Sequence, residues 1–258
     1  MMCPFTRITG ILLILFTHLL AHHLVAQDDI ADVVSQDRRI GDDEHKRYFS
    51  IEPTPDEVAP REGYGLVVIL PGGDGSAEFL PFVKRIRKHA TPDGFLVAQP
   101  VAIKWTPEQE IVWPTVKSRV DKMKFTTEEF VADVIKDVGT RHKLDPTRIF
   151  TLSWSSSGPA AYSISLTNPQ VTGSFIAMSV FKKDLLPPLE QSKGHRYYLY
   201  HSPDDRVCPM WMAESAQKVL KEAGAQVELA TYKGGHGWKP GLYDHIRTGI
   251  EWLEPPVE

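Results

Sequence analysis

Apolar residues recur along the chain in two alternating patterns. Continuous apolar runs, typical of strands covered on both faces, occur at residues 66–70 and 95–98, and residues 174–178 are predicted to form a further strand. Between these runs, apolar residues spaced three or four apart predict helices over residues 79–90 and 130–138. Strands that alternate with helices indicate an α/β fold, with a mostly parallel central sheet flanked by helices and no large cap domain.

Other segments mark the ends of these elements. Thr126 and Glu129 have the spacing of a capping box, which predicts where the second helix begins. Residues 46–51 are predicted to form an edge strand. Residues 99–125 show no clear period, and loops of this length are usually functional, so we expect a pocket wall there.

A glycine-rich loop, residues 71–76, follows the buried strand 66–70. In parallel sheets, ligands bind beyond the carboxyl ends of the strands. A Walker loop is excluded because no Gly-Lys-Ser/Thr follows, and the glycine spacing of a dinucleotide site is also missing. Two interpretations remain: a loop that presents backbone N–H groups to an oxyanion, or a plain tight turn.

A second motif lies between residues 149 and 162, which read IFTLSWSSSGPAAY. A strained turn between a strand and a helix can expose a nucleophilic serine if small residues stand two places before and two places after it. Ser155 meets this condition, with Ser153 and Ser157 around it, whereas Ser156 would place bulky Trp154 at the crowded position. The alternative is a serine-rich loop without catalytic chemistry.

A serine hydroxyl becomes a nucleophile only when a base takes its proton, and the base needs a carboxylate to orient it. Two later segments offer these groups just past predicted strands. Residues 201–209 read HSPDDRVCP and contain the candidate acids Asp204 and Asp205, while residues 234–238 read GGHGW and contain His236.

With these motifs the chain resembles the α/β-hydrolase superfamily, in its carboxylesterase/phospholipase and dienelactone-hydrolase-like branch. The order Ser…Asp…His is that of the superfamily, and GGHGW is the most specific part of the resemblance. Its acid loop commonly reads H-G-x-x-D-x-x-V-P, so aligning His201 and Pro209 on the ends implies Asp205 as the acid and places Cys208 at the valine. The resemblance covers roughly residues 46–253.

The resemblance also implies an oxyanion hole, formed by the backbone N–H groups of Ser156 and Gly73, with Asp74 as the alternative to Gly73. The sequence departs from the pattern at two places. Serines replace both glycines of the turn, and Leu-Pro-Gly-Gly stands at residues 70–73, where many relatives have His-Gly. Small size is kept at each place, so we expect adaptation rather than loss of activity.

The function implied is hydrolysis of a carboxylic ester by a serine esterase with the triad Ser155, His236 and Asp205, without a cofactor. The alternatives are a dienelactone-hydrolase-like or peptidase activity on the same scaffold. The first would use a cysteine at the turn, and the second would usually carry a propeller. A non-catalytic extracellular protein that binds carbohydrate or aryl groups is a further alternative, because tryptophans lie in or beside the predicted mouth loops. The predicted pocket residues are Trp105, Trp113, Trp154 and Trp238.

The first 26 residues have the layout of a signal peptide, with Arg7, an apolar run over residues 8–20 and small Ala26. We expect export to the periplasm or the extracellular space, although a retained anchor is the alternative. Residues 27–45 are polar and predict a flexible leader, which leaves residues 46–258 as one α/β-hydrolase domain.

Charge and cysteine content narrow the partners. Removal of Arg7 with the signal changes the net charge from −4 to −5, which disfavours nucleic acid. Cys3 would leave with the signal, so Cys208 has no intramolecular partner. The histidines and cysteines show no metal-ligand spacing, and no metal is expected. The expected partner is a small-molecule or polysaccharide-linked ester, no stable membrane span is expected, and the sequence does not indicate an oligomeric state.

Overall fold

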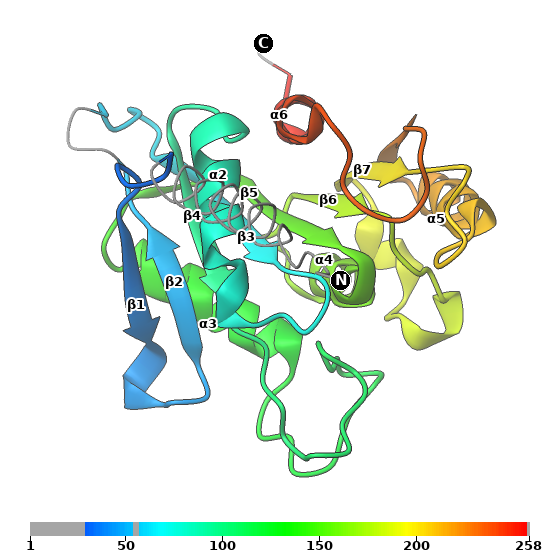
Figure 1. The fold of residues 1–258 in the computed structure, drawn as a ribbon, viewed down its shortest axis with the longest axis horizontal. Coiled ribbons are helices and arrows are strands. Elements are labelled where there is room, and N and C mark those ends of the chain that lie inside the picture. The colour runs from blue at the N-terminus through cyan, green and yellow to red at the C-terminus, as the bar shows by residue number, and fades with distance from the viewer. Residues whose placement is uncertain (1–28, 54–56, 257–258) are drawn as a thin grey trace, which may run out of the picture.

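The computed structural model describes residues 29–53 and 57–256, so the predicted signal peptide lies outside the described residues. An eight-stranded sheet forms the centre of the domain, in the order β1-β2-β4-β3-β5-β6-β7-β8 (Figure 1). Strands β1 and β2 are antiparallel to their neighbours, and the other pairs are parallel. The strands are β1 (Ser35–Arg39), β2 (Arg47–Ile51), β3 (Tyr64–Leu70), β4 (Phe95–Pro100), β5 (Leu144–Trp154), β6 (Gly173–Ala177), β7 (Arg196–His201) and β8 (Gln226–Thr231).

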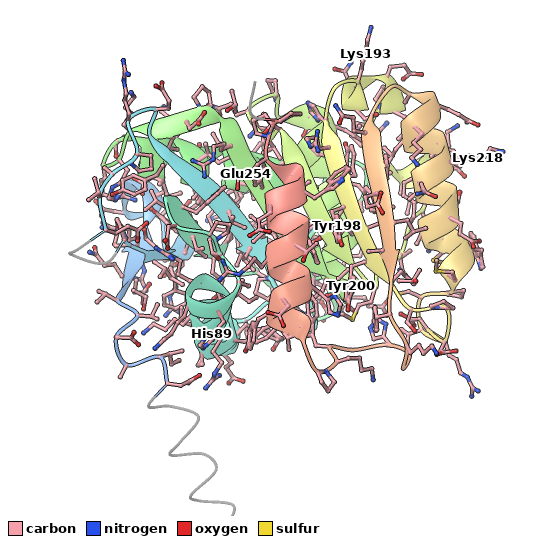
Figure 2. All side chains as sticks on the ribbon, turned by 90° about the horizontal axis from the view of Figure 1, so that it is seen from above. His89, Lys193, Tyr198, Tyr200, Lys218 and Glu254 are labelled. Carbon is pink, nitrogen blue, oxygen red and sulfur yellow. The ribbon has the colours of Figure 1, made fainter. Side chains whose placement is uncertain are left out.

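Helices cover both faces of this sheet. On one face lie α2 (Leu80–His89) and α6 (Leu242–Leu253), which bury side chains such as Val83 and Ile250 in a common core with β3 and β5. On the other face lie α3 (Thr127–Gly139), α4 (Gly158–Thr167) and α5 (Met210–Glu222). Figure 2 shows α6 lying along the sheet beside Tyr198 and Tyr200 of β7. The predicted α/β fold with a mostly parallel sheet is confirmed.

The apolar patterns explain why these elements form. Every residue of β3 and β4 is buried, as expected for strands covered on both faces. Helix α3 begins at the predicted capping box, where the Thr126 hydroxyl accepts from the Glu129 backbone N–H at 3.2 Å and the Glu129 carboxylate accepts from the Thr126 N–H at 2.7 Å. These two bonds pair donors that the first turn of a helix otherwise leaves free.

The N-terminal segment differs from the prediction. Residues 35–39, inside the predicted flexible leader, form β1 and pair with β2 along their whole length. The prediction of a leader over residues 27–45 is therefore wrong for this stretch, and residues 46–51 are the second strand of the sheet rather than its edge. A polar sequence is compatible with an edge strand, because one side of such a strand faces water.

Basic residues of α2 form ion pairs with the segment that precedes β1. Arg85 pairs with Asp29 at 3.1 Å, and Lys88 pairs with Asp32 at 2.7 Å. Ile30 is buried among the core residues that α2 contributes. Contacts distant in sequence, rather than a local period, therefore order the segment before β1.

None of the helices within residues 29–53 and 57–256 has both the length and the hydropathy needed to span a membrane.

Candidate active site

Ser155 occupies the turn between β5 and α4. Strand β5 ends at Trp154, a single 3₁₀ turn spans Ser155–Ser157, and α4 begins at Gly158. The backbone of Ser155 has φ of +56°, in the left-handed region that side chains other than glycine rarely adopt. Strain of this kind persists only where the surrounding structure enforces it, and it is common at functional sites.

Close packing around the turn explains its small residues. A Cβ atom on Gly158 would lie 1.7 Å from the Ser179 hydroxyl, and one on Gly72 would lie 2.4 Å from the Trp154 carbonyl oxygen. The turn and the glycine-rich loop are therefore pressed against their neighbours, and larger side chains would displace them.

The two serines at the usual glycine positions behave differently. The Ser157 hydroxyl accepts from the Trp154 N–H at 3.1 Å and donates to the Leu70 carbonyl oxygen at 2.7 Å, so it joins the turn to the end of β3. The Ser153 hydroxyl is fully buried and has no hydrogen-bond partner among the described residues. Both positions accept a small side chain, but only Ser157 uses its polar group.

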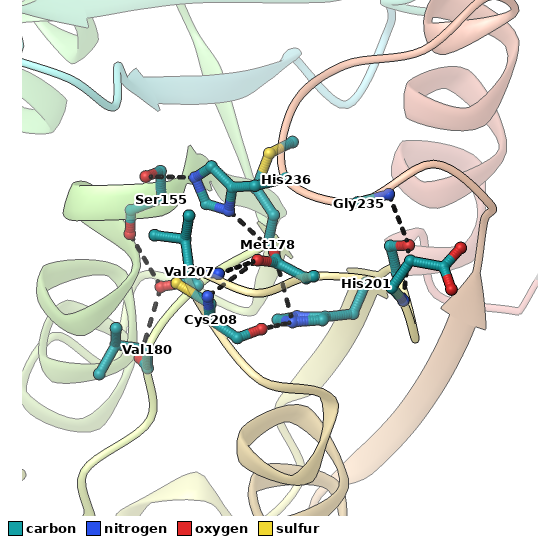
Figure 3. A network of polar contacts seen from close by, with 12 residues as sticks. Ser155, Met178, Val180, His201, Val207, Cys208, Gly235 and His236 are labelled. Carbon is teal, nitrogen blue, oxygen red and sulfur yellow. Dashed lines mark hydrogen bonds and ion pairs between the residues drawn. The ribbon is translucent and has the colours of Figure 1, made fainter.

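The structure brings Ser155, His236 and Asp205 together in one chain of hydrogen bonds (Figure 3). The Ser155 Oγ lies 3.0 Å from His236 Nε2, and His236 Nδ1 lies 2.8 Å from Asp205 Oδ2. An ionised carboxylate can only accept, so the Nδ1–H donates to Asp205. Nε2 of the neutral ring is then free to accept the serine proton.

The Asp205 carboxylate is held from its other side by backbone donors. Its Oδ1 accepts from the N–H groups of Val207 and Cys208, both at 2.8 Å, and its side chain is fully buried. Burial by itself would raise the pKa of Asp205, but the bonds from Cys208, His236 and Val207 outweigh burial and hold this pKa below the usual value for aspartate. The acid is therefore ionised while it contacts His236.

The neighbouring carboxylate, Asp204, points elsewhere. It is exposed, and its Oδ2 accepts from the Gly234 N–H at 3.3 Å. The Ser202 hydroxyl accepts from the Gly235 N–H at 3.1 Å. Asp204 and Ser202 thus contact the backbone just before His236, whereas Asp205 contacts the imidazole ring itself.

Two further residues support the acid and histidine loops, and the sequence motifs did not single them out for this role. Buried His201 donates from Nε2 to the Cys208 carbonyl oxygen at 2.6 Å, which ties the end of β7 to the acid loop. Met178, after β6, has φ of +41° and accepts the Gly237 N–H on its sulfur at 3.2 Å. The positive φ of Met178 is what marks this residue in the structure, and no pattern in the sequence predicts a positive φ there.

The predicted oxyanion residues lie beside Ser155. Gly73 has φ of +62°, and its carbonyl oxygen accepts from the Ser156 hydroxyl at 2.9 Å. This bond links the glycine-rich loop after β3 to the turn after β5. Asp74, the alternative residue, accepts the Ser76 N–H at 3.0 Å and forms a local turn.

A cavity of about 380 Å³ opens beside Ser155. Its wall comes from the long loop before α3, from the segment after β6 and from the acid loop. Apolar side chains dominate this wall, and Glu110 and Lys182 stand among them. The apolar members and the thiol are Ile111, Val112, Trp113, Pro159, Val180, Leu185, Val207 and Cys208.

Of the four tryptophans predicted to line the pocket, the structure places only Trp113 there. Trp105 stacks on His45 and is not among the residues that line the cavity, so its expected place in the cavity wall is wrong. Trp154 and Trp238 pack edge to face, with ring centroids 5.7 Å apart, on the core side that carries α2. Because consecutive side chains of a strand point to opposite faces, Trp154 is directed into the core and away from the cavity.

Comparisons with known proteins rest on structure. No family model matches the sequence, and no curated protein matches it. A carboxylesterase from Mesorhizobium loti superposes with a TM-score of 0.61 at 14% identity, over 83% of this chain and 98% of that one. An esterase from Rhizomucor miehei gives a TM-score of 0.65 at 14% identity, over 88% of this chain and 84% of that one.

A third solved structure is that of Thermogutta terrifontis esterase 2, described as phosphorylated by paraoxon. It superposes with a TM-score of 0.60 at 12% identity, over 88% of this chain and 97% of that one. These superpositions establish the architecture. At such low sequence identity they do not establish the chemistry, which has to be argued from the residues. The chain thus has the α/β-hydrolase fold, which these esterases share.

Proposed function

We propose that the protein hydrolyses carboxylic esters through an acyl-enzyme on Ser155. The observation that carries this proposal is the bonded series from Ser155 through His236 to Asp205, located at the carboxyl ends of β5, β8 and β7. A serine with a base on its hydroxyl and a carboxylate on that base has the arrangement that nucleophilic catalysis requires.

In the first half of the reaction, Ser155 Oγ attacks the ester carbonyl carbon while its proton passes to His236 Nε2. Asp205 keeps the ring in the correct tautomer and stabilises the imidazolium that forms. The tetrahedral intermediate then collapses, the alcohol leaves with the proton from Nε2, and the acyl group stays on Ser155. Water repeats the sequence and releases the acid, so no cofactor is consumed.

The negative oxygen of the intermediate needs donors that are fixed before the reaction. The backbone N–H groups of Gly73 and Ser156 are the proposed donors. Their positions are coupled, because the Ser156 hydroxyl donates to the Gly73 carbonyl oxygen. A change in the glycine-rich loop is therefore expected to affect turnover more than substrate binding.

The cavity indicates the kind of ester. Its volume of about 380 Å³ is at the small end of ligand pockets, and apolar side chains form most of its wall. Each methylene group buried there contributes about 0.8 kcal/mol to binding. We therefore propose esters with a short to medium apolar acyl or aryl group as substrates.

The test is turnover of p-nitrophenyl butyrate together with labelling by a fluorophosphonate, followed by intact mass. We expect one phosphonyl group on the wild-type protein and none on Ser155→Ala, whose kcat should fall about 10⁴-fold or more. Ser156→Ala is the matched control. It keeps Ser155 and both backbone N–H groups, so it should still be labelled, and the loss of the bond to the Gly73 carbonyl oxygen should lower kcat by less than about tenfold. An unlabelled wild-type protein without turnover would instead indicate a binding protein.

A further inference from the structure

Cys208 adds a thiol to the acid–histidine pair. One ligand atom from each of Cys208, Asp205 and His236 lies within 4.8 Å of the other two. Ser155 and His236 do not require a thiol at this position, where the resembled pattern has valine. Sulfur, nitrogen and oxygen donors in one group are the ligand types that bind Zn²⁺ and related thiophilic cations.

The thiol can be reached from the cavity. Cys208 is one of the residues that line the cavity beside Ser155, although only 2% of its surface is exposed to solvent. It is also a free cysteine, so no disulfide occupies its sulfur. Figure 3 shows the Cys208 side chain on the same side of the acid loop as Ser155 and His236.

We propose that Cys208, His236 and Asp205 form an inhibitory site for a thiophilic divalent cation such as Zn²⁺ or Cd²⁺. On binding, the thiol releases its proton to solvent, so a thiolate and a carboxylate balance the two positive charges. Three protein ligands leave a fourth position for water. Tetrahedral zinc would hold the sulfur and nitrogen about 3.5 Å apart, and these atoms now lie within 4.8 Å, so the two side chains need to approach by about 1.3 Å at most.

The cation would stop the base whichever ring nitrogen of His236 it takes. On Nε2 it occupies the lone pair that accepts the Ser155 proton. On Nδ1 it displaces the Asp205 contact and leaves the single proton of the neutral ring on Nε2, which then cannot accept. In either arrangement Nε2 can no longer accept the Ser155 proton, so binding of the cation inhibits the enzyme.

Cobalt provides a test that does not depend on activity. Co²⁺ added to the purified protein should produce a thiolate-to-cobalt charge-transfer band in the near ultraviolet. Ser155→Ala keeps all three ligands and should give the same band, whereas Cys208→Val, which removes the sulfur, should give none. A wild-type spectrum without the band, or the same band in Cys208→Val, overturns the site.

Zinc inhibition is the second measurement, and it rests on the proposed esterase function. Wild-type hydrolysis of p-nitrophenyl butyrate should be lost as ZnCl₂ is added and recovered with EDTA. In Cys208→Val, measured against its own metal-free rate, the half-inhibiting zinc concentration should rise about tenfold or more, the size of effect expected for a weakened metal site. Equal sensitivity of both proteins overturns the proposal, whereas failure of the esterase proposal leaves the cobalt result intact.

Discussion

The proposed catalytic groups and the cavity wall lie side by side but are positioned by different parts of the fold. Ser155, Asp205 and His236 each come within five residues of the end of a parallel strand, at β5, β7 and β8. The wall comes largely from residues 101–126 and from the segment after β6, which have little regular structure. Under the proposed function, the sheet therefore positions the reacting atoms, and the loops determine which substrate fits beside them.

The adjacent carboxylates Asp204 and Asp205 test whether the groups at the strand ends carry the reaction. We expect the largest effect on turnover from these two variants. Asp205→Asn should lower kcat by about 10³ to 10⁴ with little change in KM, because the amide leaves His236 in the wrong tautomer. Asp204→Asn should lower kcat less than about tenfold, since an exposed carboxylate interacts weakly through water. Steady-state kinetics on one aryl ester measures both variants, and the reverse ranking would make Asp204 the acid.

Ser153 and Ser157, two positions before and after Ser155, make a matched pair for a test of stability. Ser157→Ala should reduce the free energy of unfolding by about 1–3 kcal/mol, because the buried Trp154 N–H and Leu70 carbonyl oxygen lose their shared partner. Ser153→Ala should be neutral or stabilising, because it removes a buried hydroxyl that has no partner among the described residues. Urea unfolding of the three proteins decides, and equal losses would contradict this account.

Substitutions in the cavity wall should change the preference for one ester over another rather than the chemical step. Leu185→Trp narrows the cavity and should lower kcat/KM for p-nitrophenyl octanoate about tenfold more than for the acetate, since several buried methylenes are lost. Val116→Trp is the control. Val116 is 45% exposed, close to the 47% of Leu185, but it does not line the cavity. A similar chain-length shift in both variants would place the acyl group elsewhere.

The smallest effect should be on acid stability. The pKa of Asp205 is lower in the folded protein than in the unfolded chain, so its stabilising contribution is complete above about pH 5. It is lost as the pH falls through the unfolded value, about 3.9, toward the folded one. The urea midpoint should therefore fall less between pH 6 and pH 3 in Asp205→Asn than in the wild type. Equal falls would contradict the lowered pKa.

The sequence was most informative where structure is local. A buried strand, a turn of small residues and a capping box each lie within a few positions, and β3, the Ser155 turn and α3 were predicted from them. The acid could be chosen because the frame from His201 to Pro209 is short, and the structure puts Asp205 rather than Asp204 against the His236 ring.

Predictions that depend on long-range contacts fared less well. Trp154 and Trp238 are predicted to line the pocket because they lie in or beside the predicted mouth loops, yet Trp154 points to the other face of the sheet. Residues 35–39 show no period, and partners eight to sixteen residues away hold this stretch in the sheet. Arg47, ten residues from Asp37, also pairs with it at 2.9 Å. Neither arrangement can be deduced from neighbouring residues.

The left-handed backbone of Ser155 limits how this site can evolve. Threonine carries a second heavy atom on Cβ and would clash in that conformation, so a secondary alcohol is not an available nucleophile. Cysteine is unbranched at Cβ and fits the same backbone. A single substitution could therefore convert this scaffold into a thiol hydrolase, whereas a threonine enzyme would require the turn itself to be rebuilt.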